Sequence, residues 1–194
     1  MNGRYIVAVD QSTSATKACL FDRSGSIVRR ATVEHRQIYP QAGYVEHDAE
    51  ELVENTHRAI SRVVAEAEVE TRSVAALAIT NQRETIVAWD ARSGKPLYNA
   101  LVWQDERGTA ACRVLMERGA GEEIRNRTGL VVDTYFSASK LQWMVENVPE
   151  CAQAANAGSL MAGTVDAWLI YSFTNGELFV TDYSNASRTL LFNI

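Results

Sequence analysis

The stretch YIVAVDQSTSATKACLFDRSGSIVRRATVEH (residues 5–35) decides the fold of this chain. It contains three segments of strand length, 5–10, 17–22 and 27–35, which are apolar or alternate between apolar and polar residues and are separated by short polar turns. Connections this short join antiparallel strands, because a parallel pair needs a crossover of a dozen or more residues. The stretch therefore predicts a meander of three antiparallel strands, not the βαβ unit of a doubly wound sheet.

A long helix and further strands are predicted after the meander. Residues 48–68 carry an apolar stripe at helical spacing, and Asp48 followed by Glu51 is typical of a helix N-terminus. Residues 74–80 are apolar enough to predict a buried strand. Further strands are predicted at 85–90 and 101–103, and further helices at 105–118, 120–127, 137–147 and 164–174. The pattern indicates an α/β protein with a mixed sheet and flanking helices.

Composition restricts the classes of function. The chain has 194 residues with 46% hydrophobic and 22% charged residues, which is ordinary for a globular protein. A net charge of −5 argues against a broad surface for nucleic acid or anionic membrane, but allows one phosphate in one pocket. Three cysteines without a C-x-x-C pair indicate reduced thiols, and no run approaches the length of a membrane span. We expect a cytoplasmic protein with no nucleic-acid or membrane partner.

Polar residues concentrate in the turn between the first two predicted strands. DQSTSATK (residues 10–17) places a carboxylate, four hydroxyls and an ammonium within eight residues. A tight turn directs backbone N–H groups toward one point, which suits phosphate oxygens, and Asp10 at a strand end could hold Mg²⁺ directly or through water. The alternative is a solvated hairpin, because serine and threonine favour turns. The segment is not a G-x-x-x-x-G-K-[ST] loop.

Three other places along the chain could bind a small polar ligand. Arg83 and Glu84 follow an apolar strand and can exchange hydrogen bonds with polyol hydroxyls. Trp103 could form an apolar wall against C–H groups, and the hydroxyl of Tyr135 could orient a substrate. Each has a structural alternative, which is a surface ion pair for the first two residues and core packing for the aromatic ones.

Seven short motifs occur in a fixed order along the chain. They are DQ-x-TS (10–14), YP-x-x-GYVEHD (39–48), ITNQRET (79–85), YNA-x-VWQ (98–104), GL-x-x-D-x-YFS (129–137), GTVD-x-WLI (163–170) and TDY-x-NASRT (181–189). Together they resemble the N-terminal part of the FGGY family of carbohydrate kinases, and within it the branch that acts on glycerol. The resemblance covers essentially all of residues 5–194. Any one motif is weak, but seven in the same order outweigh the structural alternatives.

The resemblance implies an actin-like ATPase or ribonuclease-H-like fold, in which two such domains hold ATP between them. It implies ATP-dependent phosphorylation of a small polyol, converting glycerol to glycerol 3-phosphate. The matching positions are Asp10 for Mg²⁺, Thr13, Ser14 and Lys17 for the ATP phosphates, Arg83, Glu84 and Tyr135 for the glycerol hydroxyls, and Trp103 for the wall beside its carbons.

The phosphate loop departs from the family pattern at three positions. Ser12 stands where the family usually has glycine, which reduces backbone freedom. Ala15 replaces a usual serine, and Lys17 replaces a usual arginine, which keeps the charge but loses the fork geometry. These changes bear on nucleotide binding. The glycerol-binding set is intact, which favours glycerol over a pentulose.

The resemblance places the catalytic base outside this sequence. In the family the base is an aspartate in a Gly-Asp-Gln segment, and this tripeptide does not occur here. We therefore expect no catalytic residue in 1–194, an incomplete N-terminal domain, an exposed sheet edge or apolar face near the C-terminus, and negligible kinase activity from the chain alone. The alternatives are another FGGY kinase acting on a ketopentose or a longer polyol, a non-catalytic polyol- or phosphate-binding fragment, and a structural role. Homo-oligomerisation is left open.

Overall fold

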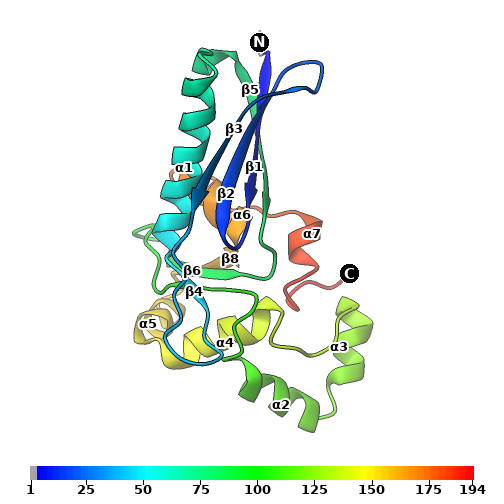
Figure 1. Ribbon diagram of the computed structural model, residues 1–194. Coiled ribbons are helices and arrows are strands. Elements are labelled where there is room, and N and C mark those ends of the chain that lie inside the picture. Colours follow the sequence, from blue (N-terminus) through cyan, green and yellow to red (C-terminus); the bar gives the residue numbers. More distant parts are fainter. Residues whose placement is uncertain (1–3) are drawn as a thin grey trace. The chain divides into compact units, whose positions relative to one another are not determined.

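Two compact units make up the computed structural model, which describes residues 4–194. Unit 1 contains the residues up to Arg36 together with Glu50–Gln82, and unit 2 contains Gln37–Ala49 together with Arg83–Ile194. Figure 1 labels the elements of both units. Among the described residues, no helix combines the length and the apolar character that a membrane span requires.

Unit 1 is built on a mixed sheet of four strands. The order is β3-β2-β1-β5, in which β1, β2 and β3 are antiparallel neighbours and β5 is parallel to β1 (Figure 1). The strands are β1 (Tyr5–Gln11), β2 (Ala15–Phe21), β3 (Ile27–Glu34) and β5 (Val74–Asn81). The predicted meander is confirmed. Strand β2 begins earlier than predicted, because Ala15 and Thr16 still pair with Glu34 and Val33.

The core of unit 1 lies between this sheet and α1 (Ala49–Glu66), the predicted long helix. Ala59 and Val63 of the helix are fully buried and cluster with Val7, Val9 and Leu20 of the sheet. Burying a side chain such as valine or leucine stabilises the fold by about 1.5–3 kcal/mol. Buried and less buried residues alternate along β1, so successive side chains at its polar end point to opposite faces of the sheet.

Strand β5 corrects one prediction. A strand forms over these residues as expected, after the short 3₁₀ helix η1 (Thr71–Ser73), but it is not buried. Ala75, Ala76, Leu77 and Ala78 are all exposed, because β5 is an edge strand of its sheet. An apolar sequence shows that a strand can be covered on both faces, but among the described residues of unit 1 no strand pairs with the outer edge of β5.

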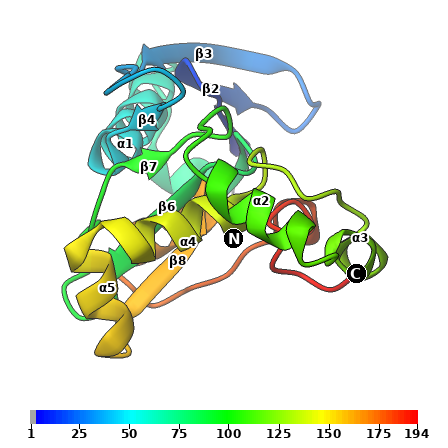
Figure 2. The ribbon, with the colours of Figure 1, turned by 90° about the horizontal axis from the view of Figure 1, so that it is seen from below.

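Unit 2 holds a second sheet and most of the helices. The sheet has the order β4-β7-β6-β8 with antiparallel neighbours, and α4 and α5 lie against β6 (Figure 2). Its strands are β4 (Glu46–His47), β6 (Ile86–Asp90), β7 (Ala100–Leu101) and β8 (Leu160–Thr164). Its helices are α2 (Thr109–Glu117), α3 (Gly121–Thr128), α4 (Ser137–Asn147), α5 (Pro149–Asn156), α6 (Val165–Phe173) and α7 (Tyr183–Ala186).

Most predicted elements of unit 2 are confirmed, with two corrections at the boundaries. Helix α4 has the predicted bounds, whereas α2 begins at Thr109 and not at 105, because the preceding residues form a turn. Strand β7 ends before Trp103, which lies in a turn. Near the C-terminus, Phe179 and Leu191 are exposed.

Candidate functional site

The turn between β1 and β2 carries the residues predicted to bind phosphate and metal. Asp10 and Lys17 are opposite each other in the β1–β2 ladder, and Lys17 Nζ lies 4.0 Å from Asp10 Oδ2. The hydroxyl of Ser12 donates to Asp10 Oδ1 at 2.7 Å. The side chains of Lys17 and Asp10 are 56% and 48% exposed, so their pairing contributes little to stability. Both groups are accessible to a ligand.

A buried polar cluster lies beneath this turn, and sequence analysis gave it no role. The cluster consists of Gln11, Thr16, His35, Asn55 and Thr56. His35 Nε2 lies 2.9 Å from Gln11 Nε2, and His35 Nδ1 lies 3.1 Å from Asn55 Nδ2. Burial lowers the pKa of His35, so its ring is neutral at neutral pH. The histidine also fixes the turn through its backbone, because His35 N donates to Ser14 O at 3.0 Å.

Asp10 is the carboxylate of this turn that could hold a metal ion. Over residues 4–194, no group of three His, Cys, Asp or Glu side chains is placed to hold a metal ion. Mg²⁺ in nucleotide sites usually keeps several waters and binds one or two carboxylates together with phosphate oxygens. A single half-exposed carboxylate in a turn that is predicted to bind phosphate fits that donor set, so Asp10 stays the candidate metal ligand.

All four residues predicted to bind the polyol belong to unit 2. Arg83 and Glu84 form the turn that leads into β6. Glu84 is 4% exposed and has a φ of 65°, and the hydroxyl of Ser137 donates to its carbonyl oxygen at 3.0 Å. Such a conformation costs about 1–3 kcal/mol for a residue with a side chain, and it is typical of functional sites. Arg83 is exposed and has no hydrogen bond or ion pair to any residue among 4–194.

Trp103 and Tyr135 form an aromatic pair at the same site. Their ring centroids lie 5.4 Å apart, and the planes are tilted by 59°. Trp103 N donates to the hydroxyl of Thr85 at 3.1 Å, which ties the tryptophan to the residue after Glu84. The ring of Tyr135 is 37% exposed. The structure thus brings together an apolar wall, a phenol hydroxyl and a carboxylate.

Lys140 holds the turn that carries Tyr135, and no sequence signal pointed to it. Its side chain is fully buried, and Nζ donates to the carbonyl oxygens of Thr134, Tyr135 and Phe136 at 2.7, 2.9 and 2.9 Å. Burial lowers the pKa of Lys140 to about 8. The ammonium therefore fixes three successive carbonyl groups above the first turn of α4.

A buried ion-pair network stabilises the segment that follows Trp103. Arg107 bonds to Asp105 Oδ1 at 2.8 Å and to Glu46 Oε1 at 2.7 Å, and the side chains of all three are at most 2% exposed. Its guanidinium also lies 4.0 Å from the ring centroid of Tyr44. Burial opposes the charge, but the hydrogen bonds to Asp105 and Glu46 raise the pKa of Arg107. Breaking one partner of such a network costs about 3–5 kcal/mol.

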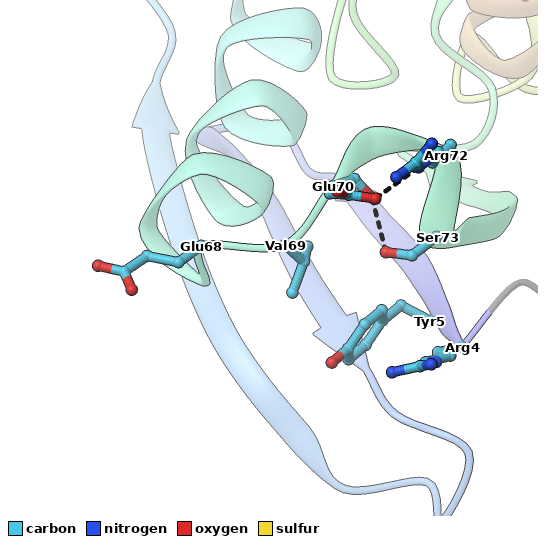
Figure 3. A pocket seen from close by; sticks show the side chains of 7 residues that line it. All are labelled: Arg4, Tyr5, Glu68, Val69, Glu70, Arg72 and Ser73. Carbon is cyan, nitrogen blue, oxygen red and sulfur yellow. Dashed lines mark hydrogen bonds and ion pairs between the residues drawn. The ribbon is translucent and has the colours of Figure 1, made fainter.

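A hollow of about 470 Å³ in unit 1 is unrelated to these groups (Figure 3). It lies at the start of β1, whereas Asp10 is near the strand's end. Its lining residues are Arg4, Tyr5, Glu68, Val69, Glu70, Arg72 and Ser73. Glu70 is already paired with Arg72 at 2.5 Å and accepts from Ser73 Oγ through its carbonyl (Figure 3). None of the predicted site residues lines this hollow.

The fold and the comparisons with known proteins together assign this chain to a family. Three antiparallel strands with a fourth parallel to the first, covered by a helix, make unit 1 a mixed α/β unit of the actin-like, ribonuclease-H-like type. Residues 5–194 match the N-terminal domain of the FGGY family of carbohydrate kinases. The chain therefore belongs to this family, as its seven motifs indicated.

Curated relatives and solved structures agree with this assignment. The chain is 53% identical over 190 residues to glycerol kinase 1 of Thermotoga maritima, covering 98% of the chain and 39% of that relative. It is 52% identical over 194 residues to a glycerol kinase of Chromobacterium violaceum, again covering 39% of the relative. The crystal structure of Plasmodium falciparum glycerol kinase with ADP is 35% identical with a TM-score of 0.89, and the match covers 98% of the chain and 38% of that structure. The chain thus spans about two fifths of the length of these relatives.

A more distant structure supports the fold alone. The gluconate kinase of Lactobacillus acidophilus has a TM-score of 0.86 at 22% identity, over 97% of the chain and 36% of that structure. The structural similarity is high although the sequence identity is low. This match therefore shows a shared arrangement of strands and helices and does not report on individual binding residues.

Proposed function

We propose that this chain provides the polyol-binding residues and the phosphate-binding turn of a kinase that converts glycerol to glycerol 3-phosphate with ATP. The observation that carries the proposal is the grouping of Glu84, Trp103 and Tyr135 in unit 2. The two aromatic rings are in contact, and hydrogen bonds to backbone groups hold Trp103 and Glu84 in place. The identity of more than half to two glycerol kinases supports glycerol as the polyol.

Each group of this site has a separate task in the proposal. The Glu84 carboxylate accepts hydrogen bonds from glycerol hydroxyls, Arg83 donates to a hydroxyl oxygen, and Trp103 excludes water from the carbon side. Arg83 is suited to this task because its guanidinium has no partner among residues 4–194. Phosphoryl transfer depends mostly on positioning and on electrostatic stabilisation, so holding one hydroxyl in place is a large part of the catalysis.

The turn after β1 receives the ATP phosphates in this proposal. Thr13, Ser14 and Lys17 supply hydroxyl, backbone N–H and ammonium donors, and Asp10 would hold Mg²⁺. When bound, Mg²⁺ supplies positive charge against the phosphate oxygens. Lys17 lies beside Asp10 but remains exposed, so it is free to contact a phosphate from solvent.

We further propose that residues 1–194 are part of a first kinase domain and that the catalytic base comes from the remaining length seen in the relatives. No Gly-Asp-Gln segment occurs in the sequence. The three free cysteines, Cys19, Cys112 and Cys151, suit the reducing cytoplasm in which we place the enzyme.

Calorimetry with glycerol and a kinase assay with ATP, Mg²⁺ and glycerol test the proposal together. We expect saturable glycerol binding to the chain that is lost in Arg83→Ala and kept in Arg92→Ala, an exposed arginine elsewhere in unit 2. We expect no turnover from the chain alone. Absence of saturable glycerol binding, or tighter binding of a ketopentose than of glycerol, would contradict the proposed substrate, and turnover at about 1–100 s⁻¹ would contradict the external base.

A further inference from the structure

We infer that Arg188 is a positioning residue of the polyol site, which holds the carboxylate of Glu84 and the ring of Tyr135 in the arrangement that receives the hydroxyls. The inference rests on the proposed function. Arg188 lies 104 residues from Glu84 in the sequence, in the segment after α7, and reaches the site from a different element.

Arg188 forms an ion pair with the carboxylate of Glu84. Arg188 Nε donates to Glu84 Oε1 at 2.5 Å, and the two side chains are 33% and 5% exposed. A buried carboxylate loses its hydration, so it needs a partner to remain charged at low cost. No other group among residues 4–194 donates a hydrogen bond to this carboxylate. Arg188 therefore occupies one oxygen and leaves Oε2 to accept from a polyol hydroxyl.

Arg188 also contacts two aromatic rings. Its guanidinium carbon lies 4.9 Å from the ring centroid of Phe136 and 5.6 Å from that of Tyr135, within the range of a cation–π interaction. Tyr135 in turn contacts Trp103. One side chain thus contacts both the carboxylate of Glu84 and the ring of Tyr135, and its displacement would move both together.

The position of Arg188 is set by the fold around it. Arg188 N donates to Asn185 O at 3.0 Å, and Asp182 caps the short helix α7 by accepting from Asn185 N at 2.7 Å. In the next residue, Thr189 O accepts from Ala138 N at 2.9 Å, in the first turn of α4. The segment that carries Arg188 is therefore hydrogen-bonded to the helix that begins two residues after Tyr135.

The chemistry requires arginine and not only a positive charge. Arg188 pairs through Nε while its guanidinium carbon lies over two aromatic rings, which uses the delocalised group that the ammonium of lysine lacks. A lysine at this position would restore the charge beside Glu84 without the guanidinium's contact with the rings. The conservative variant Arg188→Lys thus separates the effect of the charge from the effect of the aromatic contacts.

The test measures glycerol affinity by calorimetry on the full chain. We expect Arg188→Gln to weaken glycerol binding by about tenfold to hundredfold, and Arg188→Lys to recover part of the loss. Arg127→Gln is the matched control, because Arg127 forms an exposed ion pair with Glu123 in the same unit, with both side chains 67% exposed. We expect that control to bind glycerol like the unmodified chain.

A double-mutant cycle with Glu84→Gln distinguishes positioning from a merely structural role. If Arg188 acts through the carboxylate, Arg188→Gln reduces glycerol affinity much less in the Glu84→Gln background than it does in the unmodified chain. Unchanged affinity of Arg188→Gln, or full additivity in the cycle, overturns the inference. If Arg188→Gln does not fold, Arg188→Lys decides, and unmodified affinity in that folded variant overturns the need for the planar group. Failure of the unmodified chain to bind glycerol overturns the proposed function instead.

Discussion

The backbone of Glu84 has a φ of 65°, in a region that residues with a side chain rarely occupy. Its side chain is buried in the candidate site and its carbonyl group accepts from Ser137. Glycine would relieve the backbone strain, whereas alanine would keep it and lose the same carboxylate. The two substitutions therefore separate the strain at this position from the function of its side chain.

For this pair we expect Glu84→Gly to be more stable than Glu84→Ala by about 1 kcal/mol, because alanine at a positive φ is strained. Chemical denaturation of both variants measures the difference in the free energy of unfolding. Both variants lose glycerol binding. Equal stability of the two would show that the fold does not impose the strained conformation.

The pKa of His35 gives a pH dependence of known sign. Burial lowers this pKa below the ordinary 6.5, so between the two values the unfolded chain binds a proton that the folded chain does not. Stability from this group is thus present above pH 6.5 and is lost as the pH falls through 6.5 toward the folded value. We expect the free energy of unfolding to decrease from pH 7 to pH 5, with a smaller decrease in His35→Gln.

His57 is the control for that measurement. It lies on α1 but is exposed, so His57→Gln is expected to retain the pH dependence of the unmodified chain. An unchanged slope in His35→Gln would contradict the assignment of the effect to the buried cluster under the turn between β1 and β2.

Residue types at the site could be predicted from sequence, but their mutual support could not. Glu84, Trp103 and Tyr135 stand in local motifs, so the sequence alone suggests each of them as a candidate. Lys140 and Arg188 were not given a role, because their partners are carbonyl groups and a carboxylate that only the folded chain brings close. The carbonyl partners of Lys140 are only four to six residues away, but backbone carbonyl groups leave no mark in a sequence pattern, and the partner of Arg188 lies 104 residues away.

At the scale of elements, the same limit explains which predictions failed. Helix α4 has a clear start and end, and its bounds were predicted correctly. Strand β8 has the sequence LMAGT, a short segment with a glycine and no alternation of apolar and polar residues, so the sequence does not predict it. Strand β5 was predicted as buried because its residues are apolar, yet its place in the sheet order is at an edge. Whether a neighbour is present depends on topology and not on the strand's own residues.

The edge position of β5 predicts how the strand tolerates substitution. Ala78 in β5 is exposed, whereas Ala18 in β2 is fully buried in the core of the same unit. We expect Ala78→Lys to change the free energy of unfolding by no more than about 0.5 kcal/mol, and Ala18→Lys to cost more than about 4 kcal/mol. Thermal melting followed by circular dichroism measures both. A large loss for Ala78→Lys would show that the outer side of β5 is covered in solution.

At the scale of the whole molecule, ligand binding and folding are linked. A ligand that binds only the folded chain raises the free energy of unfolding, by about 2.7 kcal/mol at a hundred times its dissociation constant. We expect glycerol to raise the melting temperature of the unmodified chain more than that of Glu84→Gln. The variant is needed because glycerol, as an osmolyte, also stabilises proteins in general. Equal shifts in both would show that the effect is that of a cosolvent.

The burial of Lys140 has a consequence for chemical labelling. The chain has three lysines, at positions 17, 95 and 140, and the first two are exposed. A pKa of about 8 would make the Lys140 amine reactive, but its complete burial keeps reagents away. Apart from the α-amino group, an acylating reagent is thus directed to Lys17 and Lys95. Mass spectrometry of these two adducts becomes a footprint of the proposed phosphate-binding turn, and Lys95 serves as the internal standard for the protection of Lys17.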